Sequence, residues 1–221
     1  MQWCQSCKKG INLCRCFEPL LRTVVPTAVD LGIFSLDAKM PKKFRALFSG
    51  TYNKYYDLDL NRLFIEELLR QVSLETHWAR PKESNTFNLG VGEDKMIPAT
   101  QIEMANIIPN YSFGVSVCKL NAGASLTAAM PTKIGEFLAC GRPIVVNKGL
   151  GDMDQFIEES RIGVILDGNP SNLKRSAGEL IELLNDKDTP SRCRAVAEKY
   201  FSMDVGARKY LGIYEEMKIS S

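Results

Sequence analysis

One short segment combines residue types that could bind a phosphorylated ligand. Pro131, Thr132 and Lys133 begin a helical pattern, and Glu136 follows about one turn later. Proline suits the first helical position, so the cap position falls on Met130, which has no side-chain acceptor for the free N–H groups of the first turn. Such a helix start attracts phosphate, and Lys133 adds a positive charge while Thr132 adds a hydroxyl donor. Glu136 is within reach of a sugar or ribose hydroxyl.

The same residues also have a purely structural interpretation. Glu136 would complement the dipole of its own helix, Lys133 would be a solvated surface lysine, and Gly123 would ease a turn. The residue pattern by itself does not separate this interpretation from the ligand-binding one.

The elements around this segment predict a parallel α/β sheet. From about residue 44, short β-branched or aromatic runs alternate with longer helical patterns, which is typical of βαβ units. We therefore expect a Rossmann-like α/β fold, a three-layer arrangement with helices on both faces of a parallel sheet. In such sheets a ligand binds at the carboxyl ends of the strands, beside the helix starts that follow them. The expected strands are 44–48, 74–78, 86–89, 113–118, 143–147 and 163–166.

Helical spacing of apolar residues places the helices between and after these strands. The clearest helix lies between the first two strands and begins near Asp57 or Asp59, either of which could cap it. The candidate helix should end at Gly141, because glycine commonly follows the last helical residue. Further helices are expected over 102–108, 173–184, 195–201 and 205–218.

The first 40 residues lack this alternation, so we divide the chain into an appendage with a linker remnant, 1–40, and a Rossmann-like domain, 41–221. Four cysteines in the appendage could form a zinc site, since zinc takes four soft ligands, but their second pair is too closely spaced for the usual pattern. Reduced thiols in an appendage are the alternative. These four are Cys4, Cys7, Cys14 and Cys16. The remaining cysteines, expected in or near the core, are Cys118, Cys140 and Cys193.

Charge and hydropathy argue against two classes of partner. The chain carries 28 Lys and Arg against 26 Asp and Glu, so its net charge of +2 gives no field that would select nucleic acid. No apolar run approaches the roughly 18 residues of a membrane span. The N-terminus shows cysteines and lysines where a signal peptide would be apolar, so a cytoplasmic protein with reduced thiols is expected.

A longer pattern around the candidate segment resembles a known family. Residues 131–145 read Pro-Thr-Lys-Ile-Gly-Glu-Phe-Leu-Ala-Cys-Gly-Arg-Pro-Ile-Val. This run is similar to the Pro-Thr-Lys-x-x-Glu-x-x-Ala-x-Gly-x-Pro-Val-Val pattern in the second Rossmann-like domain of the retaining GT-B glycosyltransferases, the glycosyl transferases group 1 family. Shorter similarities follow the family's order across roughly residues 23–218, among them Val-Pro-Thr-Ala-Val-Asp at 25–30 and Tyr-Phe-Ser at 200–202.

The resemblance implies a domain that binds a nucleoside-diphosphate sugar. It implies that Glu136 holds the ribose hydroxyls, while Thr132 and Lys133, with the backbone amides after Pro131, face the diphosphate. Transfer would need no obligatory metal, because helix dipoles and basic side chains stabilise the departing diphosphate. The implied enzyme is a hexosyltransferase-like glycosyltransferase.

Two departures from the family pattern limit what the resemblance implies. In the turn after the first strand, Gly50 would let the backbone approach the diphosphate, with Thr51 and Lys54 nearby. The family's Arg and Lys-Gly pair is absent from that turn. Lys119 would be a further diphosphate contact by position. Ala128 stands eight residues before Glu136, where many members have a glutamate that contacts the donor sugar. The donor sugar therefore stays open.

The family's architecture also implies a missing half. GT-B enzymes hold the acceptor on the other domain, so this chain is expected to be inactive or weakly active alone. The acceptor, a glycan, a lipid or a small molecule, would bind an N-terminal half that is absent or supplied by a partner chain, and any peripheral membrane contact would pass through that half. The alternative is a non-catalytic nucleotide-binding or assembly module. An oxidoreductase is disfavoured because Gly-x-Gly-x-x-Gly is absent, and His77 is expected to be structural.

Overall fold

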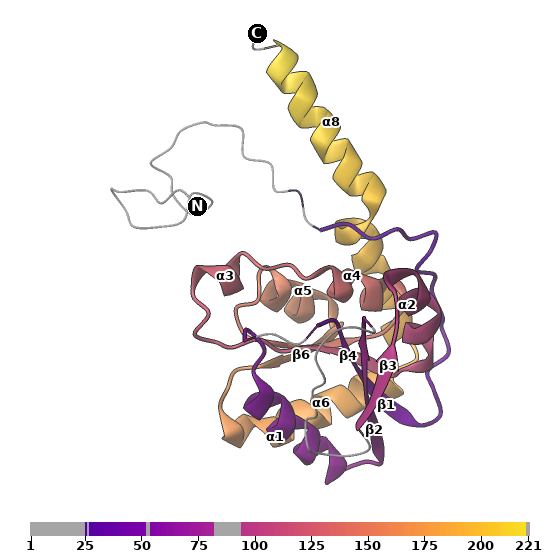
Figure 1. Cartoon of the computed structure of the whole chain (residues 1–221), viewed down its shortest axis with the longest axis vertical. Helices are drawn as coiled ribbons and strands as arrows, with labels where there is room; N and C mark the ends of the chain where they lie inside the picture. Colours follow the sequence, from indigo (N-terminus) through magenta and orange to yellow (C-terminus); the bar gives the residue numbers. More distant parts are fainter. Residues whose placement is uncertain (1–24, 26, 52–53, 82–93, 220–221) are drawn as a thin grey trace.

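The computed structural model describes residues 25, 27–51, 54–81 and 94–219, and in this part of the chain six strands form one sheet. The strands lie in the order β3-β2-β1-β4-β5-β6, and every pairing is parallel. Helices cover both faces of the sheet (Figure 1), which confirms the predicted Rossmann-like α/β fold. The strands are β1 (Phe44–Ser49), β2 (Leu74–Arg80), β3 (Asp94–Pro98), β4 (Phe113–Ser116), β5 (Ile144–Asn147) and β6 (Gly163–Leu166).

Five of the predicted strands are confirmed, and the strand predicted over 86–89 lies outside the described residues. The strand that pairs with β2 on its outer side is β3, which was not predicted. β3 is an edge strand that ends in Pro98. Proline lacks the N–H of a ladder hydrogen bond and is tolerated at such an edge. Its two leading residues, Asp94 and Lys95, are charged, so local sequence rules do not favour a strand there.

Successive side chains of each strand point to opposite faces of the sheet and enter two separate cores. In β1, Ala46 and Phe48 pack on the side of α1 (Leu58–Leu69) and α6 (Leu173–Asn185). Leu47 joins the opposite core. That core contains residues of α2 (Gln101–Ile107), α4 (Thr132–Ala139), α5 (Met153–Ser160) and α7 (Thr189–Val196). Burial on both faces explains why a central strand such as β5 begins with the continuous apolar run Ile-Val-Val.

Local signals set several helix ends as predicted. Asp57 is the N-cap of α1, and its carboxylate accepts a hydrogen bond from the Leu60 amide at 3.0 Å. Gly141 follows α4 with φ of +76°, a left-handed conformation that glycine adopts without strain. The helix predicted over 195–201 comprises the end of α7 and a π-helical turn, η4 (Ala197–Phe201). Short elements not predicted are α3 (Ala124–Thr127), η2 (Ile108–Asn110) and η3 (Pro170–Asn172).

The described part of the first 40 residues packs against the domain. Val29 donates its N–H to the carbonyl of Phe201 at 2.7 Å and accepts from the amide of Met203 at 3.2 Å. Val29 and Phe34 are both buried in the core that contains α4. The division of the chain at residue 40 stays a prediction, but residues 27–40 share contacts with the domain that follows them.

A buried arginine fixes the end of this segment. Arg142 follows α4, is 0% exposed, and donates to the carbonyl oxygens of Asp37 and Lys39, both at 2.9 Å, and of Pro109 at 2.7 Å. Its guanidinium also lies 3.4 Å from the carboxylate of Asp37. Arg142 thereby ties the chain entering β1 to the turn after α2 and to the end of α4.

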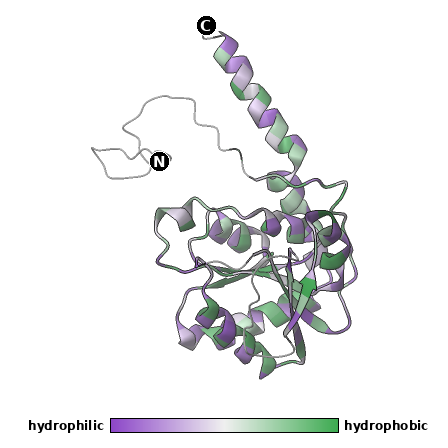
Figure 2. Ribbon diagram, in the orientation of Figure 1, coloured by the Kyte–Doolittle hydropathy of each residue, from purple (hydrophilic) through white to green (hydrophobic). Residues whose placement is uncertain are grey.

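The last described element is α8 (Met203–Ile219), a helix predicted over 205–218. α8 projects away from the sheet and the other helices (Figure 1), and hydrophilic and hydrophobic residues alternate along it (Figure 2). Five of its large side chains are 54–60% exposed, namely Met203, Tyr210, Leu211, Tyr214 and Met217. Over the described ranges, no helix combines the length and apolar character needed to cross a membrane. The cytoplasmic location stays a prediction.

Candidate functional site

The helix that carries the candidate residues begins one residue later than predicted. Pro131 has the φ that its ring imposes, −62°, but its ψ of 128° is extended, so Pro131 is the N-cap and Thr132 the first helical residue. Met130 is therefore not the cap, and that expectation was wrong. Proline also lacks a side-chain acceptor, and α4 has no side-chain cap hydrogen bond. The expected feature is still present: no cap side chain accepts a hydrogen bond from the N–H groups at the start of α4.

Lys133 points to the carboxyl end of β1. Its ammonium donates to the carbonyl oxygen of Ser49 at 3.0 Å and to the hydroxyl of Tyr56. The side chain is half-buried, which differs from the solvated surface lysine of the structural interpretation. Because Ser49 precedes Gly50, the fold brings Lys133 to the turn that the sequence resemblance placed beside it.

Glu136 is buried, with 6% of its surface exposed. One carboxylate oxygen accepts from the side-chain amide of Gln101 at 3.3 Å, across the junction of α4 and the start of α2. Burial raises the pKa of the Glu136 carboxyl, and the Gln101 hydrogen bond and the charge of Lys133 oppose this shift. A buried carboxylate with one long side-chain hydrogen bond is costly for the fold, and such groups are concentrated in binding sites.

Gly50 has φ of +99°, a conformation that any other residue adopts only with strain. Its N–H donates to the carbonyl of Ala79 at 2.9 Å, and its carbonyl accepts from the indole N–H of Trp78 at 2.7 Å. The backbone groups of Gly50 are therefore already bonded within the fold. A Cβ at this position would have nothing nearer than the Tyr56 hydroxyl, at 3.8 Å, so the backbone conformation, and not a lack of space, requires glycine here.

The other predicted contacts are exposed and lie around the same loops. Thr51 and Lys54 are exposed, and the Lys54 ammonium lies 5.5 Å from the ring centre of Tyr55. Lys119 is exposed too, and its amide donates to the carbonyl of Tyr55 at 2.7 Å. Ala128 ends α3 and is exposed. Within the described residues, no hydrogen bond or ion pair joins these side chains to Lys133 or Glu136, so their roles stay predictions.

Sequence analysis missed two partners of the candidate residues, Tyr56 and Gln101. Gln101 is the first residue of α2, which follows β3, and β3 was itself not predicted. Tyr56 lies between β1 and α1, where its sequence neighbours give no signal for a contact with α4. Both contacts join residues far apart in the chain, with separations of 35 residues for Gln101 and Glu136 and 77 for Tyr56 and Lys133.

The remaining sequence hypotheses are resolved in part. Cys4, Cys7, Cys14 and Cys16 lie outside the described residues, and within the described ranges no three His, Cys, Asp or Glu side chains form a metal cluster. The other thiols are in or near the core as predicted: Cys140 and Cys193 are buried and Cys118 is half-buried. His77 lies on β2, and its Nδ1 is 2.7 Å from the hydroxyl of Tyr111 in a half-buried contact, which is consistent with the structural role predicted for it.

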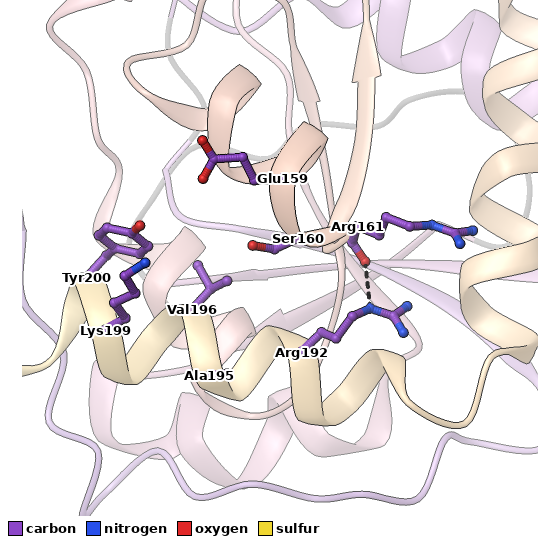
Figure 3. A pocket seen from close by; sticks show the side chains of 8 residues that line it. All are labelled: Glu159, Ser160, Arg161, Arg192, Ala195, Val196, Lys199 and Tyr200. Carbon is purple, nitrogen blue, oxygen red and sulfur yellow. Dashed lines mark hydrogen bonds between the residues drawn. The ribbon is translucent and has the colours of Figure 1, made fainter.

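A cavity of about 390 Å³ lies away from these residues, between the end of α5 and the helical segment α7–η4. It adjoins the amino end of β6, whereas α4 begins at the carboxyl edge of the sheet. Its cationic groups do not converge: Arg161 and Arg192 point to one side, and Lys199 lies at the other, beside Tyr200 (Figure 3). The geometry of this cavity therefore gives it no shared polar centre.

Comparison with known proteins gives matches of structure only. No family model matches the sequence, and no curated protein matches it. Among solved structures, sucrose-phosphate synthase from Thermosynechococcus elongatus aligns with a TM-score of 0.68 and 11% identity, over 89% of this chain and 53% of that protein. Anabaena HepE in complex with UDP-glucose aligns with a TM-score of 0.61 and 12% identity, over 86% of this chain and 56% of that protein.

An isolated domain also matches. The C-terminal domain of a glycosyl transferase group 1 family protein from Francisella tularensis aligns with a TM-score of 0.56 and 13% identity, over 80% of this chain and 100% of the domain. The chain thus spans about half the length of the longer proteins it matches, 53% and 56%. At these identities the likeness shows the fold, which is that of a C-terminal domain of the GT-B glycosyltransferases, as the sequence resemblance implied.

Proposed function

We propose that this chain is the donor-binding half of a glycosyltransferase that moves a sugar from a nucleoside-diphosphate sugar to an acceptor. The observation that carries the proposal is the buried Glu136, one turn inside a helix whose start has no side-chain cap, with Lys133 directed to the carboxyl end of β1. Parallel α/β sheets bind ligands at this edge. The complex of the similar Anabaena HepE with UDP-glucose supports the class of ligand.

Each residue has a chemical role in this proposal. The N–H groups of the first turn of α4, with Thr132 and Lys133, bind the diphosphate and stabilise the charge that develops on it as the sugar departs. The carboxylate of Glu136 accepts hydrogen bonds from two ribose hydroxyls. These bonds replace water and compensate for the burial that raises the pKa of Glu136. No step in this proposal requires a metal ion.

The test is a calorimetric titration of the chain with UDP, GDP, ADP and NAD. We expect selective binding of one nucleoside diphosphate, and at least about a tenfold weaker affinity in Glu136→Gln, which removes the charge but keeps the shape of the side chain. Glu179→Gln is the matched control, since Glu179 lies on α6 beneath the other face of the sheet. Equal affinities in Glu136→Gln and the unaltered chain would remove Glu136 from the site.

The second half of the enzyme is part of the proposal. We propose that the acceptor-binding half lies outside these 221 residues and packs against the exposed face of α8. Two observations support this: the chain spans about half of the longer proteins it matches, 53% and 56%, and α8, which projects from the domain, exposes five large apolar or aromatic side chains. Clustered exposed apolar residues mark interaction surfaces.

A non-catalytic nucleotide-binding module is the second candidate, favoured by the same half-length match. The two candidates differ once an acceptor domain is added. Sugar transfer from the donor whose nucleotide binds best would support the enzyme. Tight nucleotide binding with no transfer, in the presence of a matched acceptor domain, would support the non-catalytic module.

A further inference from the structure

The ammonium of Lys133 is held from two sides. It donates to the main-chain carbonyl of Ser49 at 3.0 Å and to the hydroxyl of Tyr56, and it lies 4.4 Å from the centre of the Tyr56 ring. Ser49 is the last residue of β1, so this cation stands at the carboxyl edge of the sheet. Lysine normally keeps several rotamers in solvent, and two acceptors restrict that freedom.

Tyr56 is itself fixed by the fold. Tyr56 and Cys118 form an antiparallel bridge, in which the Lys119 amide donates to the carbonyl of Tyr55 at 2.7 Å and the Asp57 amide to the carbonyl of Val117 at 3.2 Å. The phenol ring also meets the ring of Trp78 edge to face, with 6.2 Å between the centres. The loop after β4 and the end of β2 therefore position the hydroxyl that Lys133 reaches.

We propose that Tyr56 is a positioning residue for phosphate binding: its hydroxyl holds the Lys133 ammonium at the start of α4, where the ammonium contacts the diphosphate of a bound nucleotide. The inference rests on the proposed function for the identity of the ligand. The proposal adds Tyr56 to the candidate site. In this chain the turn after β1 lacks the Arg and the Lys-Gly pair that the family pattern has there. A cation already held in place loses less freedom when the anion binds.

Tyr56→Phe separates this role from stacking on a base. The variant keeps the ring, so a stacking role predicts unchanged affinity, whereas the positioning role predicts a loss. For UDP, GDP or ADP, whichever binds best, we expect affinity to fall about three- to tenfold, the range of one hydrogen bond. The matching nucleoside, which has no phosphate, should show no change.

A double-mutant cycle tests whether Tyr56 acts through Lys133. Lys133→Met removes the ammonium, and in that background Tyr56→Phe should cause no further loss of nucleotide affinity. An additional loss of three- to tenfold in the double variant would show that Tyr56 acts by another route. That result would overturn the proposal while leaving the proposed function intact.

Amine labelling tests the same contact without a nucleotide. Reductive methylation followed by peptide mass mapping should modify Lys133 faster in Tyr56→Phe than in the unaltered chain. Lys174 serves as the reference, because it is exposed on α6, on the other face of the sheet from α4. Inorganic pyrophosphate should slow labelling of Lys133 in the unaltered chain, and less so in Tyr56→Phe.

The two proposals fail in different ways. If none of the three nucleotides binds the unaltered chain, the proposed function is refuted, and pyrophosphate protection of Lys133 decides the inference about Tyr56. Equal labelling rates of Lys133 in both proteins, or no protection by pyrophosphate, would overturn the inference about Tyr56.

Discussion

Replacing Arg142 with methionine should destabilise the fold more than any surface charge change. The side chain is 0% exposed and donates to three carbonyl oxygens, those of Asp37, Lys39 and Pro109, at 2.7–2.9 Å. Methionine fills similar volume but donates no hydrogen bond. The carbonyls remain in the variant, so the substitution leaves acceptors without partners instead of removing both members of each pair.

The expected magnitude follows from those three acceptors. A buried acceptor that loses its partner costs about 1–3 kcal/mol, and breaking a buried charge network typically costs about 3–5 kcal/mol. Two effects reduce the loss: methionine has no desolvation cost, and residues 37–39 are partly exposed and can reach water. We therefore expect Arg142→Met to lower the free energy of unfolding by about 3 kcal/mol.

Urea unfolding at pH 7 measures this change. With an m-value of about 2–3 kcal/mol per molar, the midpoint should fall by about 1–1.5 M. Arg175→Met is the matched control, because the Arg175 side chain is 68% exposed and forms an exposed ion pair with Glu179 on the same helix, so the loss should be below about 0.5 kcal/mol. A loss below about 1 kcal/mol in Arg142→Met would refute the argument that these carbonyls depend on Arg142.

Three further predictions concern pH, backbone strain and thiol reactivity. Burial raises the pKa of Glu136, so the native state holds this proton more tightly than the unfolded chain, and Glu136 lowers stability once pH exceeds its unfolded value of about 4.3. Glu136→Gln should therefore unfold at higher urea than the unaltered chain at pH 7, with a gain that disappears at pH 3.5. Arg161 ends α5 at φ of +51°, so Arg161→Gly should raise the free energy of unfolding by about 0.5–1 kcal/mol in the same assay, and a loss would contradict the strain argument. Burial raises the thiol pKa of Cys140 to about 12 and raises that of Cys193 too, so iodoacetamide at pH 8 should modify both at least about tenfold more slowly in the folded chain than in 8 M urea; equal rates, read by mass mapping, would contradict their burial.

The opposite effects expected for Glu136→Gln, greater stability and weaker nucleotide binding, link the site to the fold. A side chain selected only for packing would not combine burial, a raised pKa and a single long hydrogen bond. If the variant were less stable at pH 7, the carboxylate would be a structural element of the α2–α4 junction.

Local patterns in the sequence determined the class of fold and the segment that carries the site. Alternation of apolar strands with helical spacing predicted the parallel sheet, because strand and helix periodicities are properties of neighbouring residues. Asp57 and Gly141 marked helix ends for the same reason, since capping involves residues within one turn. The start of α4 was misplaced by one residue because proline has nearly the same φ at the cap and at the first helical position.

Tertiary structure alone decided which distant residues meet this segment. Lys133 contacts Ser49 across 84 residues, and Arg142 contacts Asp37 across 105. These pairs depend on the strand order β3-β2-β1-β4-β5-β6, in which β1 lies beside β4. That order places the turn after β1 next to the start of α4. Strand order is fixed by packing of both faces of the sheet over the whole chain, and no local run of residues encodes it.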